Sequence, residues 1–355
     1  MKKRILTMGL SCVMLAAILS GCGGKTDSTT ETPKETETAE ETKESDETKP
    51  EETQEAKKVK IGINLALADN EFFRMVEYGL KKDFDDRGWE YMITYGQTEK
   101  ITENSNMFLA QGVDAIVEFG CDQNYGNPVV QAADEKGVPV VAIDVAYDGA
   151  YFFGANNVQA GTILGEAMAE WIKENWDGQL DAIFMETNAV NGEAVANRVE
   201  KAAVALEEKL GYGEDIVFRM EAANGDALKQ GFLDFLSAHP DYEHIAYVSG
   251  SLANVPPLVG AVETVGKTDI VCIGSHSEET WVFDHFNTTS EEADCFVGCV
   301  AYAPSDYGKY VGKMLQTLFD GETLPEETLM EHYVITRDNY KEIEAQFNEI
   351  TSKIK

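Results

Sequence analysis

Positive charge is scarce in this sequence. Among its 355 residues, 29 are Lys or Arg and 63 are Asp or Glu, so the formal net charge is −34. Nucleic acids, anionic lipid surfaces and other polyanions are attracted by a positive field, which this composition does not supply. The sequence therefore argues against nucleic-acid and polyanion partners, and it leaves the fold open.

The apolar run at residues 5–19 is too short to cross a membrane as a helix. It follows basic residues at positions 2–4 and ends in Leu19-Ser20-Gly21-Cys22. This order is typical of a lipoprotein signal, so we predict that residues 1–22 are a signal peptide with a lipid on Cys22. The alternative is a cleaved secretory signal with an incidental cysteine. A lipid would anchor the protein, without spanning, on the outer side of a bacterial cytoplasmic membrane.

Residues 23–58 contain almost nothing apolar. They consist mainly of Thr, Glu, Lys, Ser and Pro, and such a segment cannot bury enough surface to offset the entropy lost on ordering. We predict a disordered, acidic tether with a mean reach of about 30–35 Å for roughly 35 residues. It would hold a globular domain away from the bilayer.

Cysteine is infrequent, and no pair has the spacing of metal ligands. Beyond the signal, four cysteines remain: Cys121, Cys272, Cys295 and Cys299. Cys295 and Cys299 lie on one predicted strand about 13 Å apart, too far to bridge each other. The open alternatives are buried thiols, which we favour, or a disulfide from Cys272 to one of these two. No metal or cofactor is predicted.

The common catalytic motifs are missing. We find no nucleophile elbow, Walker loop, zinc-protease motif or dinucleotide fingerprint. We therefore predict that the protein is not an enzyme. The alternative, an exported hydrolase, would require an acid–base cluster that the sequence could supply from Glu118, Asp122, Asp144 and His276.

From residue 59 onward, apolar strand patterns alternate with helical patterns. Residues 138–144 form an almost wholly apolar strand between two helices, which is typical of a parallel sheet covered on both faces. A second strand–helix series begins near Ala182. Two successive series predict an α/β fold with two similar lobes.

The first strand and helix carry the most informative pattern. Residues 59–65 alternate and predict a strand with one apolar face; a helix then begins after Asp69 or Asn70 and ends at Gly88. The junction places polar and aromatic side chains at the carboxyl edge of a sheet, where open α/β sheets bind ligands. We expect Phe72, which is off the apolar stripe, to face a cleft, whereas Phe73 lies on the stripe and could instead belong to the core.

Several segments in order carry a family resemblance: ADNEFF after the first strand, GVDAIV, GVPVVAID, GANNVQAG, SAHPDYEHIAYVSGS and GKTDIVCIGSH. Together they resemble the ribose- and galactose-binding type I periplasmic binding proteins of ABC importers, over nearly everything from residue 59. The resemblance implies the type I periplasmic-binding-protein fold, with two Rossmann-like lobes and a three-crossing hinge. The expected lobes are residues 59–155 plus 303–333 and residues 156–302 plus 334–355.

The resemblance also implies site residues in the first lobe. Asn70, Phe72 and Phe73 stand where the family has polar and aromatic sugar contacts, Asp144 where a carboxylate accepts two sugar hydroxyls, and Asn157 at a crossing. An aromatic ring covers the apolar face of a sugar while carboxylate and amide groups bond its hydroxyls. The alternative for Asp144 is a carboxylate that only caps a turn.

The second lobe departs from the family pattern. Val145 and Ala196 replace expected arginines, Gly250-Ser251 replaces an Asn-Asp pair, His276 replaces an aspartate and Tyr302 a glutamine. Without those arginines no clamp for an anionic ligand is evident. We therefore predict a neutral or cationic ligand, with contacts from Ser251, His276 and Tyr302 and an aromatic portion resting on Tyr302, Phe72 and, as a further candidate, Trp281. His276 could instead be a turn residue.

These observations predict a monomeric solute-binding lipoprotein that closes around a sugar, a sugar-like molecule or a nucleoside and docks on an ABC permease. The alternative is a receptor whose loaded form docks on a sensor kinase or chemoreceptor. Both use the same fold, so the sequence does not separate them.

Overall fold

The computed structural model describes residues 58–65, 70–96, 98–119, 123–187, 193–221 and 224–354. The predicted signal, the tether, Cys22, Cys121 and Asp122 lie outside these residues. The described chain forms two six-stranded sheets with strand orders β11-β5-β4-β3-β1-β2 and β12-β10-β9-β8-β6-β7. Both sheets are covered by helices, so the predicted α/β fold class is confirmed. No described helix has the length and apolar character that crossing a membrane requires.

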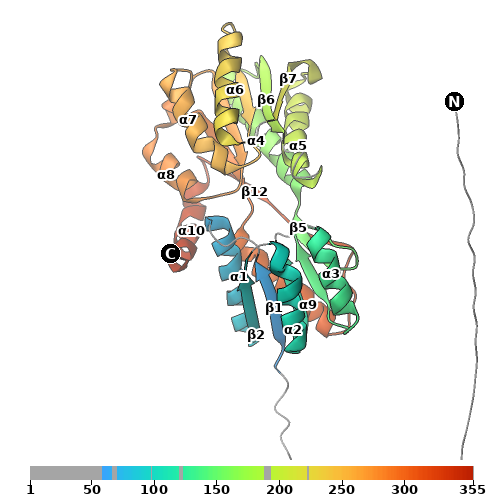
Figure 1. Cartoon of the computed structure of the whole chain (residues 1–355). Coiled ribbons are helices and arrows are strands. Elements are labelled where there is room, and N and C mark those ends of the chain that lie inside the picture. Colours follow the sequence, from blue (N-terminus) through green and yellow to red (C-terminus); the bar gives the residue numbers. More distant parts are fainter. Residues whose placement is uncertain are drawn as a thin grey trace, which may run out of the picture. The chain divides into compact units, whose positions relative to one another are not determined.

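The first lobe is built on a wholly parallel sheet. Its strands are β1 (Lys60–Leu65), β2 (Glu90–Tyr95), β3 (Ala115–Phe119), β4 (Val140–Ile143), β5 (Tyr151–Ala155) and β11 (Glu327–Met330). Its helices are α1 (Glu71–Arg87), α2 (Ile101–Ala110), α3 (Gln123–Asp134) and α9 (Tyr307–Phe319). Helices α1 and α9 cover one face of the sheet, and α2 and α3 cover the other (Figure 1).

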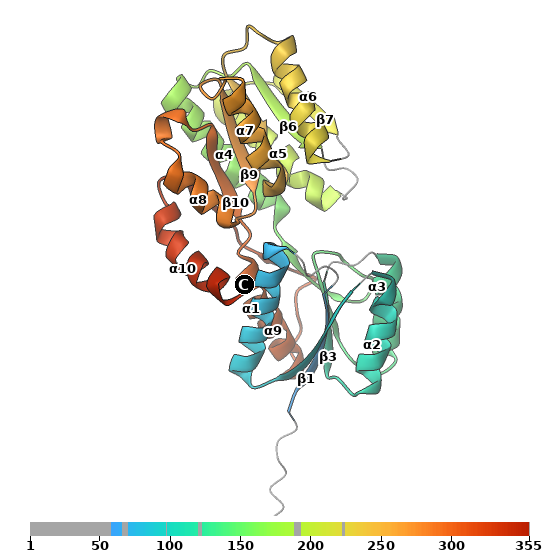
Figure 2. The ribbon, with the colours of Figure 1, turned by 60° about the vertical axis from the view of Figure 1, so that its left-hand side comes forward.

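The second lobe repeats this plan with an antiparallel edge strand, β12. Its strands are β6 (Ala182–Thr187), β7 (Val217–Glu221), β8 (Ile245–Val248), β9 (Val271–His276), β10 (Phe296–Ala301) and β12 (Tyr333–Thr336). Its helices are α4 (Asn157–Trp176), α5 (Glu193–Leu210), α6 (Gly225–Ala238), α7 (Val255–Thr264), α8 (Thr280–Thr288) and α10 (Tyr340–Lys353). Helices α4 and α5 cover one face; the other four cover the opposite face, and α10 reaches α1 of the first lobe (Figure 2).

The chain passes from one sheet to the other after β5, after β10 and after β11. A short 3₁₀ turn at Pro304–Asp306 lies in the passage after β10, and others lie in connections within a lobe, at Thr98–Lys100, Glu214–Ile216, Leu252–Asn254 and Glu291–Ala293. The three passages lie beside the carboxyl edges of the strands and therefore border the site described below.

Strand β1 has the predicted apolar face, formed by Ile61, Ile63 and Leu65, and its other face is buried as well. Gly62 packs under Phe108, and a Cβ at this position would lie 2.5 Å from that ring. Asn64 is 1% exposed, and its amide donates to Ser105 Oγ at 2.7 Å. A parallel sheet covered by helices on both sides leaves no solvent face, so the alternating polar positions must be small or fully hydrogen-bonded.

Helix α1 begins and ends where the sequence predicts. The side chain of Asn70 caps it by accepting a hydrogen bond from the Phe73 N–H at 2.9 Å. Gly88 ends it with φ of 72°, a left-handed conformation that glycine adopts without a side-chain clash. The cap fixes the direction in which the first helical turn, with its two phenylalanines, leaves the sheet.

Within the described chain, Cys272, Cys295 and Cys299 are buried free thiols. Of the two alternatives left open by the sequence, the structure therefore shows buried thiols and no disulfide among these three cysteines. Burial raises the pKa of each of these thiols, which keeps them protonated and unreactive.

Candidate ligand-binding site

A cavity of about 840 Å³ lies between the two lobes at the carboxyl edges of their sheets. All eight residues predicted to bind ligand line it: Asn70, Phe72, Phe73, Asp144, Asn157, Ser251, His276 and Tyr302. Strand ends and helix starts from both lobes contribute them, as expected for parallel sheets. Their binding roles remain a prediction.

The first lobe presents an aromatic wall, which we define as Phe72, Phe73, Phe119, Phe152 and Tyr307. Phe72 meets Tyr307 edge-on with ring centroids 5.9 Å apart, and Phe73 lies 5.0 Å from Phe119. Both α1 phenylalanines are half-buried and reach the cavity, so Phe73 belongs to the cavity as well as to the core. The edge-on contact is a favourable arrangement for an aromatic pair, and the rings of Phe73 and Phe119 are tilted by 48°.

Tyr307 reaches this wall because α9 crosses α1 at very short range. Gly79 and Gly308 meet at the crossing, where a Cβ on Gly308 would lie 2.0 Å from the Gly79 carbonyl oxygen. Tyr307 was not predicted from the sequence, because its position depends on this contact between segments far apart in the chain. The available sequence signal was Gly308, a glycine at the start of α9 where a close helix crossing is possible.

Asp144 follows β4 in a left-handed backbone conformation, with φ of 61°. Its Oδ1 accepts a hydrogen bond from the Ala155 N–H at 3.2 Å, and its Oδ2 accepts one from the Tyr307 hydroxyl at 3.4 Å. The carboxylate thus bonds the end of strand β5 and also opens onto the cavity. The surrounding protein raises the pKa of Asp144 to about 6, because it displaces water from the charged form.

Arg198 of α5, which was not among the predicted site residues, organises the wall of the second lobe. Its Nε donates to Asn157 Oδ1 at 3.1 Å and its Nη1 to the Gly250 carbonyl at 3.2 Å. The guanidinium lies 5.0 Å above the Tyr302 ring, whose hydroxyl donates to the same Asn157 oxygen at 3.1 Å. The expected arginine position, Ala196, is two residues away on the same helix.

His276 is fully buried at the end of β9, although its residue borders the cavity. Its Nδ1 lies 2.9 Å from the Ser249 carbonyl, which can only accept, so Nδ1 carries the proton. Burial, helped by the charge of Arg198, lowers the pKa of His276 to about 3. The ring is therefore neutral, with Nε2 as an acceptor that has no partner among the described residues.

Two predicted candidates lie elsewhere. Trp281 stacks on His285 at 4.5 Å and does not line the cavity, so its suggested ligand contact is wrong. Glu118 is buried inside the first sheet, where it accepts from Asn64 and from Ser105. Among the described residues, the acid–base cluster considered for a hydrolase is therefore not assembled, and no group of three metal-ligating side chains occurs.

A histidine ties the three passages together. His332 lies between β11 and β12; its Nδ1 donates to the Ala301 carbonyl at 3.0 Å, and its Nε2 accepts from the Asn156 N–H at 3.0 Å. Burial lowers the pKa of His332, which favours the neutral ring these bonds require. Beside it, the buried Glu278 accepts from the Tyr302 N–H at 2.7 Å. The passages are thus bonded to one another next to the cavity.

The comparisons with known proteins agree with this geometry. The family described as "Periplasmic binding protein domain" matches residues 61–323. The ribose import binding protein of Bacillus subtilis (strain 168) is 24% identical over 238 residues, which cover 63% of this chain and 72% of that protein. The D-ribose/D-allose-binding protein of Pseudomonas aeruginosa is 26% identical over 227 residues, covering 59% and 68%.

Solved structures show the same fold. An ABC transporter periplasmic solute binding protein from Actinobacillus succinogenes 130z with bound D-allose superposes with a TM-score of 0.67 at 15% identity, covering 80% of this chain and 100% of that one. A solute binding protein from Bacillus halodurans C-125 with bound myo-inositol gives 0.65 at 18%, covering 82% and 99%. The chain belongs to the periplasmic binding protein family, as a type I member whose relatives are sugar-binding proteins.

Proposed function

We propose that the protein is the extracytoplasmic solute-binding component of an ABC importer and that it captures a neutral sugar or sugar-like molecule between its lobes. The observation that carries the proposal is the cavity itself, where an aromatic wall from one lobe faces hydrogen-bonding groups from the other. Aromatic rings suit the C–H face of a sugar, and Asp144 supplies a charged acceptor for its hydroxyls.

The residues of the second lobe favour a neutral ligand. Two guanidinium nitrogens of Arg198 already donate hydrogen bonds to Asn157 and Gly250. The side chain is therefore not free to form a full bidentate pair with a carboxylate or phosphate. His276 is neutral and cannot form an ion pair. Bound D-allose and myo-inositol in the neighbouring structures are also uncharged polyols.

The predicted lipid anchor completes the proposal. A lipid on Cys22 would keep the protein at the outer face of the cytoplasmic membrane, where a closed, loaded monomer docks on the permease. Ligand binding would shift the population toward the closed form, with motion at the three passages. The protein would act by binding, without a cofactor and without catalysis.

Thermal melting of the full chain against a panel of ligands tests this function. The panel contains D-ribose, D-allose, D-galactose, myo-inositol, nucleosides and small amines. A ligand that binds only the folded state stabilises it by about 2.7 kcal/mol at a hundredfold excess over Kd. We expect a clear shift from a sugar or cyclitol. A shift from nucleosides or amines alone would replace the proposed ligand class, and no shift from any compound would contradict solute binding.

A further inference from the structure

We propose that Glu186, a residue outside the cavity wall, is a positioning residue whose carboxylate fixes the loop from Ser249 to Asn254 and thereby aims Arg198, Ser251 and His276 at the ligand. This inference rests on the proposed binding function. It adds a residue that neither the motifs nor the cavity lining identifies. Four hydrogen bonds converge on this one buried carboxylate.

Glu186 lies on β6 and is 1% exposed. Its Oε1 accepts from the Tyr247 hydroxyl at 3.0 Å and from the Ser249 hydroxyl at 2.8 Å. Its Oε2 accepts from the Gly250 N–H at 3.0 Å and from the Asn254 amide at 3.1 Å. Three of these four donors belong to one short loop, so a single side chain holds both ends of that loop.

The same loop holds the wall of the second lobe by its carbonyl groups. The Ser249 carbonyl accepts from His276 Nδ1 at 2.9 Å, which fixes the ring's tautomer. The Gly250 carbonyl accepts from Arg198 Nη1 at 3.2 Å, and Ser251 lines the cavity directly. A shift of the loop therefore displaces three separate parts of the site at once.

The bonds to Glu186 differ in how easily they can be replaced. The hydroxyls of Tyr247 and Ser249 can rotate and become acceptors, whereas the Gly250 N–H can only donate. A glutamine could keep its oxygen toward Gly250 and Asn254 and turn its amide toward the two hydroxyls. Methionine fills similar space without offering an acceptor. The Glu186→Met and Glu186→Gln variants therefore separate the hydrogen bonds from the packing.

A ligand-free measurement tests the positioning role by itself. The full chain contains five histidines, whose ring nitrogens can be resolved by nitrogen NMR and assigned with a His276→Asn variant. We expect the Nδ1-protonated tautomer of His276 in the wild type. Glu186→Met should produce a mixture of His276 tautomers. Glu186→Gln should keep the wild-type signal, and so should Tyr247→Phe, which removes only the hydrogen bond from strand β8 to Glu186.

Binding of the sugar that gives the largest melting shift provides the second readout. We expect Glu186→Met to weaken binding about tenfold or more, and Glu186→Gln and Tyr247→Phe to stay within about threefold. If Glu186→Met does not fold, Asn254→Asp places two carboxylates in contact and should produce the same two changes. An unchanged His276 signal together with unchanged affinity would overturn the positioning role. A wild type that binds no sugar would contradict the proposed function, and the NMR result would still decide the role of Glu186.

Discussion

Glu71 of the first lobe caps a helix of the second lobe through Thr280. The Thr280 N–H donates to Glu71 Oε1 at 2.9 Å, and the Thr280 hydroxyl donates to Oε2 at 2.9 Å. Thr280 begins α8, which has no side-chain cap of its own. A carboxylate at a helix N-terminus pairs with unsatisfied N–H groups and with the positive end of the helix dipole. This contact joins the lobes beside the cavity, which the neighbouring Glu279 lines.

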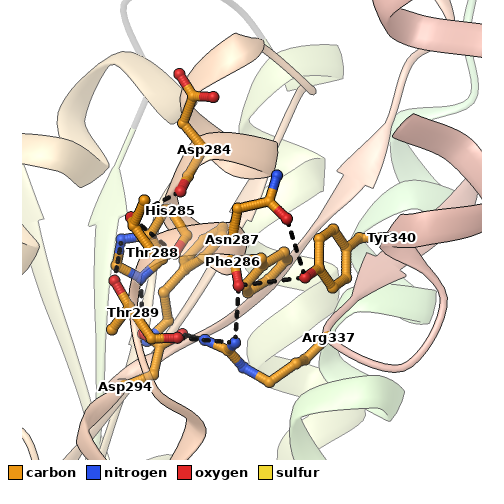
Figure 3. A network of polar contacts seen from close by, with 10 residues as sticks. Asp284, His285, Phe286, Asn287, Thr288, Thr289, Asp294, Arg337 and Tyr340 are labelled. Atoms are coloured by element: carbon orange, nitrogen blue, oxygen red, sulfur yellow. Dashed lines mark hydrogen bonds and ion pairs between the residues drawn. The ribbon is translucent and has the colours of Figure 1, made fainter. Parts of the chain in front are cut away.

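The far end of α8 is fixed within its own lobe (Figure 3). Arg337 donates to the carbonyls of Phe286 and Thr289, each at 3.1 Å, and also pairs with Asp294. Asp294 in turn lies 2.8 Å from His285 Nε2. Because α8 is also held at its C-terminal end, the bond from Glu71 connects the first lobe to a helix that is fixed within the second lobe.

Glu71→Ala should therefore favour the open form. We expect the ligand dissociation rate to rise about three- to tenfold, because the variant loses two hydrogen bonds that form only between the lobes. Stopped-flow dissociation measures this rate, and small-angle scattering of the ligand-free chain should show a larger radius of gyration. Glu77→Ala is the matched control, since Glu77 lies on the same helix and bonds Lys81 and Tyr95 within the first lobe. An equal effect of both variants would refute the interlobe role.

Asp144→Asn should weaken sugar binding by about tenfold or more, because ligand hydroxyls would lose a charged acceptor in a cavity. The pKa of Asp144 is raised to about 6, so wild-type affinity should fall as the pH drops through about 6, while the variant stays flat. Calorimetric titration at several pH values measures both effects. Asp148→Asn, on the same connection but not among the residues that line the cavity, serves as the control. A pH profile shared by wild type and variant would exclude this carboxylate as the source.

Arg198→Lys should lower affinity about tenfold despite keeping the charge. A single ammonium does not reproduce the planar fork that bonds Asn157 and Gly250 while covering the Tyr302 ring. Equilibrium titration with the sugar identified by melting provides the measurement. Lys201→Arg, one turn along α5, is a suitable control because Lys201 does not line the cavity. Retained affinity in Arg198→Lys would mean that charge alone is sufficient.

Glu278 should make the fold less stable as the pH rises. Burial raises the pKa of Glu278 from 4.5 to about 7, so the unfolded chain ionises this group first. Folding free energy is then lost between those two values and stays lost above them, by at most about 3 kcal/mol. Glu278→Gln keeps an acceptor for the Tyr302 N–H and cannot ionise.

Melting temperatures from about pH 5 to about pH 8 test this sign. We expect the difference between Glu278→Gln and wild type to grow in favour of the variant as the pH rises. Glu331→Gln, an exposed neighbour of the hinge, should follow the wild type. A difference that shrinks with rising pH would mean that the folded protein stabilises the ionised form.

Local patterns predicted much of the first lobe because they depend on neighbours in sequence. The cap at Asn70 and the stop at Gly88 are fixed by a few adjacent residues. The strand-end positions of Asp144 and His276 followed from apolar runs and from the family resemblance, and the sheets bring them to one cavity.

Features that depend on long-range packing were missed. Arg198 reaches the cavity because α5 packs along α4 and Arg198 bonds Asn157 at the start of α4, a contact that the helical pattern alone does not define. Strand β5 has only five residues, and it was not predicted although its sequence, Tyr151–Ala155, is largely apolar. The burial of the second face of β1, with Gly62 and Asn64, depends on α2, which packs over that face. The convergence of a distant loop on Glu186 has no counterpart in local sequence.

The crossing of α1 and α9 affects the size of the cavity, although it lies outside the cavity wall. Neither Gly79 nor Gly308 lines the cavity, yet their missing side chains let Tyr307 stand beneath Asp144. One methyl group added at that crossing would push the tyrosine inward or outward and resize the cavity while every wall residue kept its identity. Natural or engineered substitutions at these two positions can therefore change ligand preference, although a comparison of binding-site residues would not include either position.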